Sequence, residues 1–548
     1  MGTAMNNAKA DKVFMNGHLY TVDPERSWAE AVAISGGEIV YVGDDVRVRA
    51  FIGDATEVID LDGRLMLPGF HDSHVHLYAG GANESCCVLT DAATQAEALE
   101  MIRDYALAKG DRDGGWIVCN GLRKALIPDL NRRLLDEVSS ERPIYVMTDD
   151  GHSCWLNSRG LEIAGIDAST EDPPQGEIVR FPGTKEPNGF LHDYAAELGR
   201  DAIPQPTLDE RIDHLKTGIG LAHKFGITSI LEPGVDDELM APYLELSDRG
   251  ELTLRVMASI SPINWQPGAF GDEVYAFVAK RDNYRRPNIN PDSLKVYIDG
   301  VTENGSGVLL EPYLIPELNG KEPFYTQEEL NKYVCWADAE GLQVHLHAIG
   351  DGGMRMGLNA YEFAKNANGE TGNRHHICHV QMVDPDDVHR FGELGVAATF
   401  QPLWAYPDPV IMNLCIPFLG EERLKKFYVI NSIHKTGGLI VGGSDWFVTS
   451  LNPLDAIEVG VRRQDPNMPE GSPALNPEEA VDLATMIEAY TINGAYTLHQ
   501  DERVGSIEVG KRADLIVLDR NLFEIPATEI NENKVVLTLF DGREVYSA

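Results

Sequence analysis

The chain is poor in cysteine and in basic residues, and it contains no long apolar run. Its 548 residues include seven cysteines, an odd number without a C-x-x-C pair (positions 86, 87, 119, 154, 335, 378 and 415). This argues against a disulfide framework and against a zinc ribbon built from cysteines. No segment approaches the apolar length that spans a bilayer, and the first residues lack the apolar core of a signal peptide. We therefore expect a protein of the reducing cytoplasm.

Positive charge is scarce as well. The 46 lysines and arginines face 86 aspartates and glutamates, so the formal net charge is −40. A surface of this sign repels nucleic acids and anionic membranes, and we expect neither as a partner. We expect a small-molecule substrate instead. A homodimer is compatible with the sequence, but no sequence feature favours it over a monomer.

Apolar segments alternate with helical patterns through the middle of the chain. This alternation is typical of parallel strands joined by helices. With 43% hydrophobic residues, the chain has enough apolar surface for a large core. Eight segments fit barrel strands, which is the number in a TIM-type (β/α)8 barrel, an α/β fold. They lie near residues 68–77, 226–232, 252–259, 293–298, 342–347, 376–380, 395–401 and 439–445.

Both ends of the chain are rich in short β-branched segments separated by turn residues. We expect residues 1–66 to form a small antiparallel sheet. Together with residues 504–548 this part would complete one β-sandwich domain. Residues 67–503 would then hold the barrel.

The gap between the first two barrel strands is far longer than a βα unit needs. It predicts an inserted subdomain at about 80–205, with strands near 115–120 and 143–148. The insertion leaves the carboxyl end of the first strand. We therefore expect it to lie over the active-site face and to shape the substrate pocket.

A His-x-His pair closes the first predicted barrel strand. In the segment 67–77, an apolar run ends in His74 and His76. Residues two apart in an extended strand point to the same side, so both imidazoles would face one point, as metal ligands do. Surface histidines also occur at this spacing. The pair therefore gains weight only if later strands end in further ligands.

Later strands do end in such residues. Lys295 lies on the interior side of its strand, where a lysine is costly unless it is paired or modified; a buried lysine bridged to an aspartate is the alternative. His347 lies nearer the functional end of its strand than His345, and His379 and Asp445 end two further strands. Each residue alone is compatible with an ordinary buried polar group. The series in barrel order indicates a metal site.

These motifs resemble the amidohydrolase superfamily, and within it the amidohydrolase-3 or YtcJ-like branch that includes N-substituted formamide deformylases. The resemblance runs through nearly the whole chain in the family's order. It is specific for the fold and the metal chemistry and weak for the substrate. The matching motifs are residues 68–76, 151–158, 295–300, 347–351, 379–381, 443–445 and 505–514.

The resemblance implies one or two divalent ions, usually zinc. It assigns the first ion to His74 and His76 and the second to His347 and His379. Lys295, carboxylated on its amine, would bridge the two ions. A carbamate is anionic, so it would remove the cost of a buried ammonium group.

The resemblance also gives Asp445 two roles, as a metal ligand and as the acceptor of the proton of the nucleophilic water. His152, Trp155 and Asn157 match a family motif near the pocket, and we expect them to bind substrate. For Trp155 an ordinary core position is the alternative. 

Two positions depart from the family pattern. Cys378 stands where a glutamate is frequent, just before His379. The family commonly has an acidic residue after its second barrel strand, and in this chain Glu232 stands one position later. These departures concern the details of the pocket rather than the metal ligands.

The predicted reaction follows from the metal site. A bound metal lowers the pKa of water toward neutrality, so hydroxide is available to attack a carbonyl, and Asp445 passes the proton to the leaving amine. We predict a metal-dependent hydrolase of a non-peptide C–N bond in a small amide, an N-formyl compound or a cyclic amide. The alternatives are hydrolysis of a lactone or carbamate ester at the same site, and a non-catalytic binding or regulatory protein of the same fold.

Overall fold

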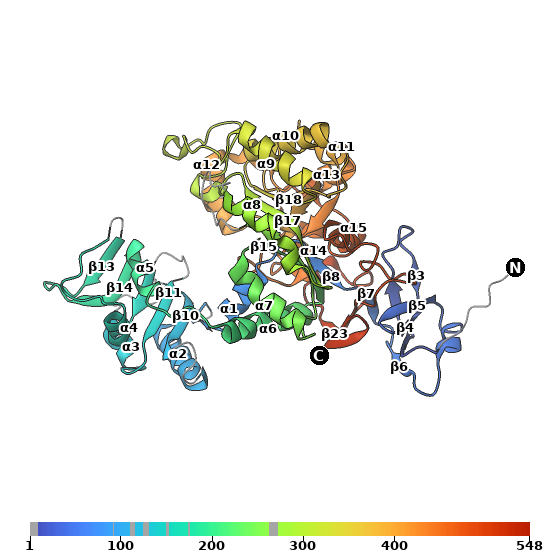
Figure 1. Ribbon diagram of the computed structural model, residues 1–548, viewed down its shortest axis with the longest axis horizontal. Helices are drawn as coiled ribbons and strands as arrows, with labels where there is room; N and C mark the ends of the chain where they lie inside the picture. Colours follow the sequence, from blue (N-terminus) through green and yellow to red (C-terminus); the bar gives the residue numbers. More distant parts are fainter. Residues whose placement is uncertain are drawn as a thin grey trace. The chain divides into compact units, whose positions relative to one another are not determined.

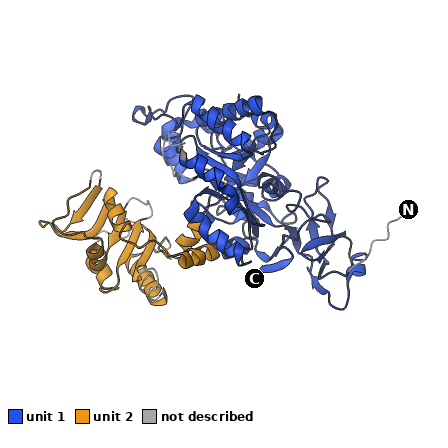
Figure 2. Cartoon of the chain, in the orientation of Figure 1, with its two compact units in different colours: residues 1–77, 219–548 blue, residues 78–218 orange. Residues whose placement is uncertain are grey.

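The computed structural model describes residues 9–90, 92–109, 115–123, 131–148, 153–173, 176–261 and 272–548. The chain forms two compact units (Figure 2). Residues 1–77 and 219–548 make unit 1, and residues 78–218 make unit 2. In the part of the chain that the structure describes, no helix is long and apolar enough to span a bilayer.

Eight parallel strands form the centre of unit 1 (Figure 1). Each pairs with the next along the chain, and the backbone N–H of Ser73 donates to the carbonyl of Gly442 (3.1 Å), which joins the first strand to the last. The predicted barrel is confirmed. Its strands are β8 (Phe70–Asp72), β15 (Ile227–Val235), β16 (Arg255–Ile260), β17 (Ile289–Tyr297), β18 (Gln343–Ala348), β19 (His376–His379), β20 (Ala397–Phe400) and β21 (Ile440–Gly442).

Helices alternate with these strands, and they explain why the strands are apolar throughout. A barrel strand is covered by helices on one face and by the barrel core on the other, so β18 is buried at every residue. α9, α10, α11 and α13 lie together beside the strands in Figure 1. The helices are α6 (Leu208–Lys224), α7 (Asp237–Asp248), α8 (Asp272–Ala279), α9 (Gln327–Ala339), α10 (Asp351–Asn368), α11 (Arg390–Leu394), α12 (Ile416–Leu419), α13 (Ile430–Lys435), α14 (Pro453–Arg462), α15 (Leu483–Ala489) and α16 (Ile492–Thr497).

Two sheets built from the chain ends form the predicted sandwich. One has the order β5-β4-β1-β6 and the other β24-β23-β22-β7-β2-β3, and the antiparallel pairing of β22 with β7 joins the two ends. Side chains from both ends share one apolar core. The strands are β1 (Lys12–Met15), β2 (His18–Tyr20), β3 (Trp28–Ala29), β4 (Ala31–Ser35), β5 (Glu38–Gly43), β6 (Glu57–Asp60), β7 (Leu65–Pro68), β22 (Leu515–Leu518), β23 (Val535–Phe540) and β24 (Arg543–Ser547).

The expectation of a purely antiparallel N-terminal sheet is wrong. β1 pairs in parallel with β6, and β2 pairs in parallel with β7. Apolar alternation identifies a strand and its buried face, but it contains no information on the direction of the neighbouring strand. 

A buried ion pair joins the barrel to the sandwich. Arg255 begins β16 and is 2% exposed. Its guanidinium donates to the carboxylates of Asp514 (2.9 Å) and Asp541 (2.6 Å), and it lies 4.8 Å from the ring centre of Phe540. These partners all belong to the C-terminal sandwich strands or their ends, so one side chain ties the two parts of unit 1 together.

Unit 2 is built around one mixed six-stranded sheet in the order β13-β14-β12-β11-β10-β9. The strands expected near 115–120 and 143–148 are present as β10 and β11. The prediction that this subdomain covers the pocket stays a prediction. The elements are α1 (Leu77–Glu84), β9 (Cys87–Val88), α2 (Gln95–Lys109), β10 (Ile117–Leu122), α3 (Arg132–Asp136), β11 (Ile144–Thr148), β12 (Ser153–Leu156), α4 (Ser158–Ile163), β13 (Gly176–Arg180), β14 (Pro187–Asp193) and α5 (Tyr194–Arg200).

Candidate metal centre

His74 and His76 converge on one carboxylate, but they do so from a turn and not from a strand. β8 already ends at Asp72, whose carboxylate accepts hydrogen bonds from the backbone N–H groups of His74 (3.2 Å) and Ser444 (3.0 Å). The Nε2 atoms of His74 and His76 lie 3.4 and 3.3 Å from Oδ1 of Asp445. The expected convergence is present, although the extended geometry used to predict it is absent.

Asp445 reaches the two histidines because the chain after β21 turns sharply. Its φ is +53°, in the left-handed region that aspartate tolerates better than most residues, and its backbone N–H donates to the carbonyl of His74 (2.8 Å). At Gly443 a Cβ atom would lie 2.9 Å from the backbone nitrogen of His74. A side chain at this position would push the two segments apart.

His347 and His379 form the other side of the cluster. Their ring centres are 4.5 Å apart, and the ring of His379 is 4.9 Å from that of His74. A hydrogen bond between Nδ1 of His379 and Oε1 of Gln401 (2.8 Å) orients the first ring and leaves its Nε2 available. Trp404 stacks parallel to His379 at 5.6 Å. 

Three further polar side chains contact these ligands or one another inside the barrel: His345, Lys295 and Cys378. Nδ1 of His74 is 2.9 Å from Nε2 of His345, which fixes the orientation of the His74 ring. Nζ of Lys295 lies 3.5 Å from the same Nε2 and donates to Sγ of Cys378 (3.1 Å). Lys295 therefore faces the barrel interior, as predicted. The hydrogen bonds that the structure gives its amine run to the thiol of Cys378 and to the His345 ring.

The electrostatics of the cluster suit a divalent cation. Burial lowers the pKa of His74 and of His347 to about 3, so both imidazoles are neutral at pH 7. Burial raises the pKa of Asp445, but the histidines around it outweigh this effect and hold the pKa well below the ordinary value. Oδ1 of Asp445 is buried and has no hydrogen-bond donor among the described residues. Imidazole nitrogens around an unsatisfied carboxylate oxygen are a donor set that fits zinc.

Three groups of these side chains place one donor atom each within 4.8 Å of one another. They are His74, His76 and Asp445; His347, Cys378 and His379; and His74, His345 and Cys378. All six predicted ligands thus lie in or beside a single cluster, with Lys295 in contact with the cysteine.

A cavity of about 390 Å³ opens over the cluster. Its upper wall contains the aromatic rings of Tyr297, Trp404 and Tyr428 and the carboxylates of Glu303 and Asp408. Burial raises the pKa of both carboxyl groups. A larger cavity of about 720 Å³ contains none of the predicted ligands, so the smaller one is the candidate substrate site.

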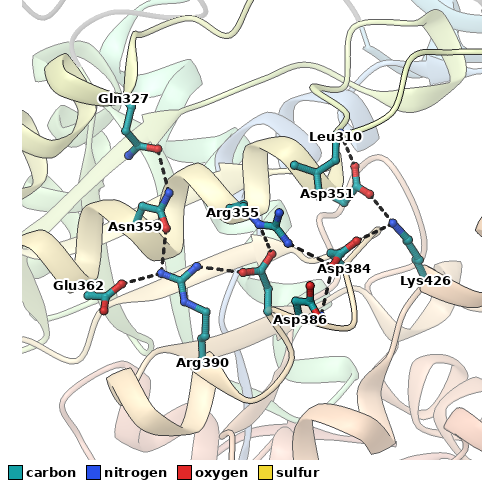
Figure 3. A network of polar contacts seen from close by, with 11 residues as sticks. Leu310, Gln327, Asp351, Arg355, Asn359, Glu362, Asp384, Asp386, Arg390 and Lys426 are labelled. Carbon is teal, nitrogen blue, oxygen red and sulfur yellow. Dashed lines mark hydrogen bonds and ion pairs between the residues drawn. The ribbon is translucent and has the colours of Figure 1, made fainter.

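A polar network joins the loop after β17, which carries Glu303, to the segment just before Tyr428 (Figure 3). Lys426 bridges the carboxylates of Asp351 (2.9 Å) and Asp384 (2.7 Å), and Arg355 donates to Asp384 (3.1 Å). Asp351 also accepts from the backbone N–H of Leu310 (2.9 Å). The network therefore joins the loops that follow β17, β18 and β19 to the segment just before Tyr428.

The sequence reasoning assigned no role in the centre to four of its residues. His345 and Cys378 each lie within two positions of a predicted ligand, on the same strand. Asp72 lies two residues before His74, and Gln401 directly follows β20. The rule that found the other ligands, a polar residue at the end of a barrel strand, would also have found Gln401.

Glu232 supports the turn that carries the histidines. Its carboxylate is buried and accepts from the backbone N–H of Leu77 (3.0 Å) and from the hydroxyl of Tyr243 (2.5 Å). This departure from the family pattern thus has a positioning role in the structure.

The three predicted substrate-binding residues belong to unit 2. His152 lies outside the described residues. Trp155 is buried in an apolar cluster of that unit. Asn157 is buried too: its Oδ1 accepts from the backbone N–H groups of Ile144 (3.0 Å) and Gly160 (2.8 Å), and its Nδ2 donates to two carbonyls. The contacts that the structure gives Trp155 and Asn157 lie within unit 2, and the substrate-binding role of all three residues stays a prediction.

Replacing Asn157 by alanine distinguishes a structural role of its side chain from a role in substrate binding. We expect a loss of about 1–3 kcal/mol of unfolding free energy for each buried backbone group left without a partner, and therefore a lower melting temperature of unit 2 in the absence of substrate. Thermal unfolding of the full chain measures this. An unchanged melting curve together with a raised KM would instead support substrate binding.

The chain is similar to several known proteins. The amidohydrolase family matches residues 57–546. Protein LONG AFTER FAR-RED 3 from Arabidopsis thaliana is 30% identical over 98% of this chain and 92% of its own length. N-substituted formamide deformylase from Arthrobacter pascens is 27% identical over 97% of both chains.

A solved structure shares the fold. It is an uncharacterized metal-dependent hydrolase from Pyrococcus horikoshii OT3, with a TM-score of 0.74 and 22% identity over 94% of this chain and 99% of that one. The family match covers every barrel strand and the sandwich strands β6, β7, β22 and β23, and it begins after β5. The chain therefore belongs to the amidohydrolase family.

Proposed function

We propose that this protein hydrolyses a non-peptide C–N bond in a small amide, an N-formyl compound or a cyclic amide, with a divalent metal at the cluster. The observation that carries the proposal is the unsatisfied Oδ1 of Asp445, which faces the imidazoles of His74 and His76 beside a cavity of small-molecule size. The deformylase relative supports the choice of bond. 

The donor atoms divide into two halves. His74, His76 and Asp445 would hold one ion, and His347 and His379 would face a second. A metal bound there would supply an acidified water and would polarise the substrate carbonyl. 

The protein's own groups supply the proton transfer and the positioning. Asp445 takes the proton of the attacking water and returns it to the departing nitrogen. Because burial lowers the pKa of His74 and of His347 to about 3, these two imidazoles do not take up the proton at pH 7. Gln401 and Trp404 hold the His379 ring in place from two sides. Burial of the cluster keeps bulk water away from the reacting atoms.

Metal content is the direct test of the proposal. We expect purified protein to hold one or two divalent ions per chain and to lose activity on chelation, with recovery when zinc is restored. His379→Ala is expected to lower metal content and activity together. His389→Ala, a change at an exposed histidine, should leave both unchanged. A fully active protein without stoichiometric metal would refute the mechanism.

The charge of the cavity wall predicts which substrates are preferred. Among the described residues that line the cavity, Lys295 is the one cationic side chain, and it lies in the metal cluster. Two carboxylates and three aromatic rings therefore favour amides with a neutral or amine-bearing substituent over amides with a carboxylate.

A substrate panel measures this preference. We expect Glu303→Gln to lower kcat/KM for amine-bearing amides by about 10- to 100-fold, since a hydrogen bond to a charged group contributes about 1.5–3 kcal/mol, and to change kcat/KM for neutral amides little. Lactones and carbamate esters belong in the same panel. If they are hydrolysed faster than every amide, the assignment to C–N bonds is wrong.

A further inference from the structure

Cys378 occupies a position inside the barrel that the assignment of ligands so far leaves without a function. It is fully buried on β19 and lies beside His347 in the register of β18 and β19. Adjacent residues of a strand normally point to opposite faces, yet Cys378 and His379 both face the cluster. The reason is the backbone: φ of His379 is +75°, so the strand ends there and the His379 ring swings inward.

The surroundings of the thiol are polar. A buried cysteine without a function usually packs as a small apolar group. Sγ of Cys378 instead accepts a hydrogen bond from Nζ of Lys295 (3.1 Å). Its Sγ also lies within 4.8 Å of donor atoms of His347 and His379 and, in a second group, of His74 and His345. 

We propose that Sγ of Cys378 is a metal ligand and completes a three-residue donor set with His347 and His379. Binding breaks the S–H bond, forms a metal–sulfur bond and releases the proton to solvent. Lys295 then donates to the bound sulfur, in place of bridging two ions as a carbamate. A sulfur ligand selects zinc or a softer ion over magnesium and calcium, which prefer oxygen. The inference rests on the metal centre of the proposed function.

Two measurements on the full chain test the sulfur ligand without relying on activity. X-ray absorption of the zinc-loaded wild-type protein is expected to show a sulfur neighbour at about 2.3 Å beside nitrogen neighbours at about 2.0–2.1 Å. The cobalt-loaded protein is expected to show a thiolate-to-cobalt charge-transfer band in the near ultraviolet. The first measurement needs no variant, so a folding defect cannot obscure it.

A matched pair of variants locates the sulfur. Cys378→Ser should abolish the charge-transfer band. It should also weaken zinc binding by more than about 10-fold, since loss of a residue that only orients a metal ligand already costs about 10- to 100-fold in affinity. Cys119→Ser, at a buried strand cysteine of unit 2, should keep both.

The outcomes separate this inference from the proposed function. Stoichiometric zinc without a sulfur neighbour, together with a carbon-13 carbamate signal after incubation with labelled bicarbonate, overturns the inference and leaves the hydrolase proposal in place. A wild-type protein that binds no divalent metal overturns both.

Discussion

Replacing Asp445 by asparagine is expected to lower turnover by about 10²- to 10⁴-fold, the contribution of a positioned acid–base group. Asparagine has nearly the same shape and keeps an oxygen towards His74 and His76, but it takes up no proton. The expected result is therefore a protein that still binds metal and is nearly inactive. kcat per bound ion, with metal content measured on the same sample, is the quantity to compare.

The control for this change is Asp386→Asn. Asp386 is an exposed aspartate in the loop after β19, where the same chemical change removes one negative charge from a residue that belongs to none of the candidate ligand groups. It should retain wild-type turnover. Full activity of Asp445→Asn would show that another group moves the proton. A wild-type protein that binds metal and hydrolyses no compound of the panel would favour the non-catalytic alternative.

The largest effect on stability is expected at Arg255. Arg255→Met would leave the carboxylates of Asp514 and Asp541 at the boundary of barrel and sandwich without their buried cation. Removing one partner of a buried ion pair costs about 3–5 kcal/mol. We expect a lower melting temperature in scanning calorimetry, and a separate early transition as the sandwich loosens from the barrel.

A surface pair is the matched comparison. Arg249, at the end of α7, forms an ion pair with Glu245 one turn earlier, and both side chains are exposed (40% and 41%). Arg249→Met should cost about 0.5 kcal/mol or less, because exposed ion pairs contribute little. If the two variants melt alike, the buried pair does not hold the sandwich to the barrel.

The barrel was predictable because its strands are buried on both faces. Such strands appear in the sequence as short apolar runs, and β18, β19 and β21 lie where those runs lie. The ligands were predictable because polar residues that end such runs meet at one edge of a barrel. This argument found Lys295 and Asp445 although they are far apart in the sequence.

The remaining features depend on backbone geometry that the sequence pattern does not express. Alternation would place Cys378 and His379 on opposite faces, and only the positive φ of His379 brings both inward. The His-x-His pair was found for a reason that does not apply, since both residues follow the end of β8. Strand directions in the sandwich depend on which segments meet, and the segments that meet come from opposite ends of the chain.

The pairing of β7 with β22 also determines when the sandwich can close during synthesis. Leu67 on β7 pairs with Ile516 on β22, and only Gly69 separates β7 from the first barrel strand. On the ribosome β7 emerges before the barrel strands and remains without this partner until all of them have been translated. The sandwich therefore closes after the barrel strands are complete, and the strand that leads into His74 and His76 gains its final neighbour only then.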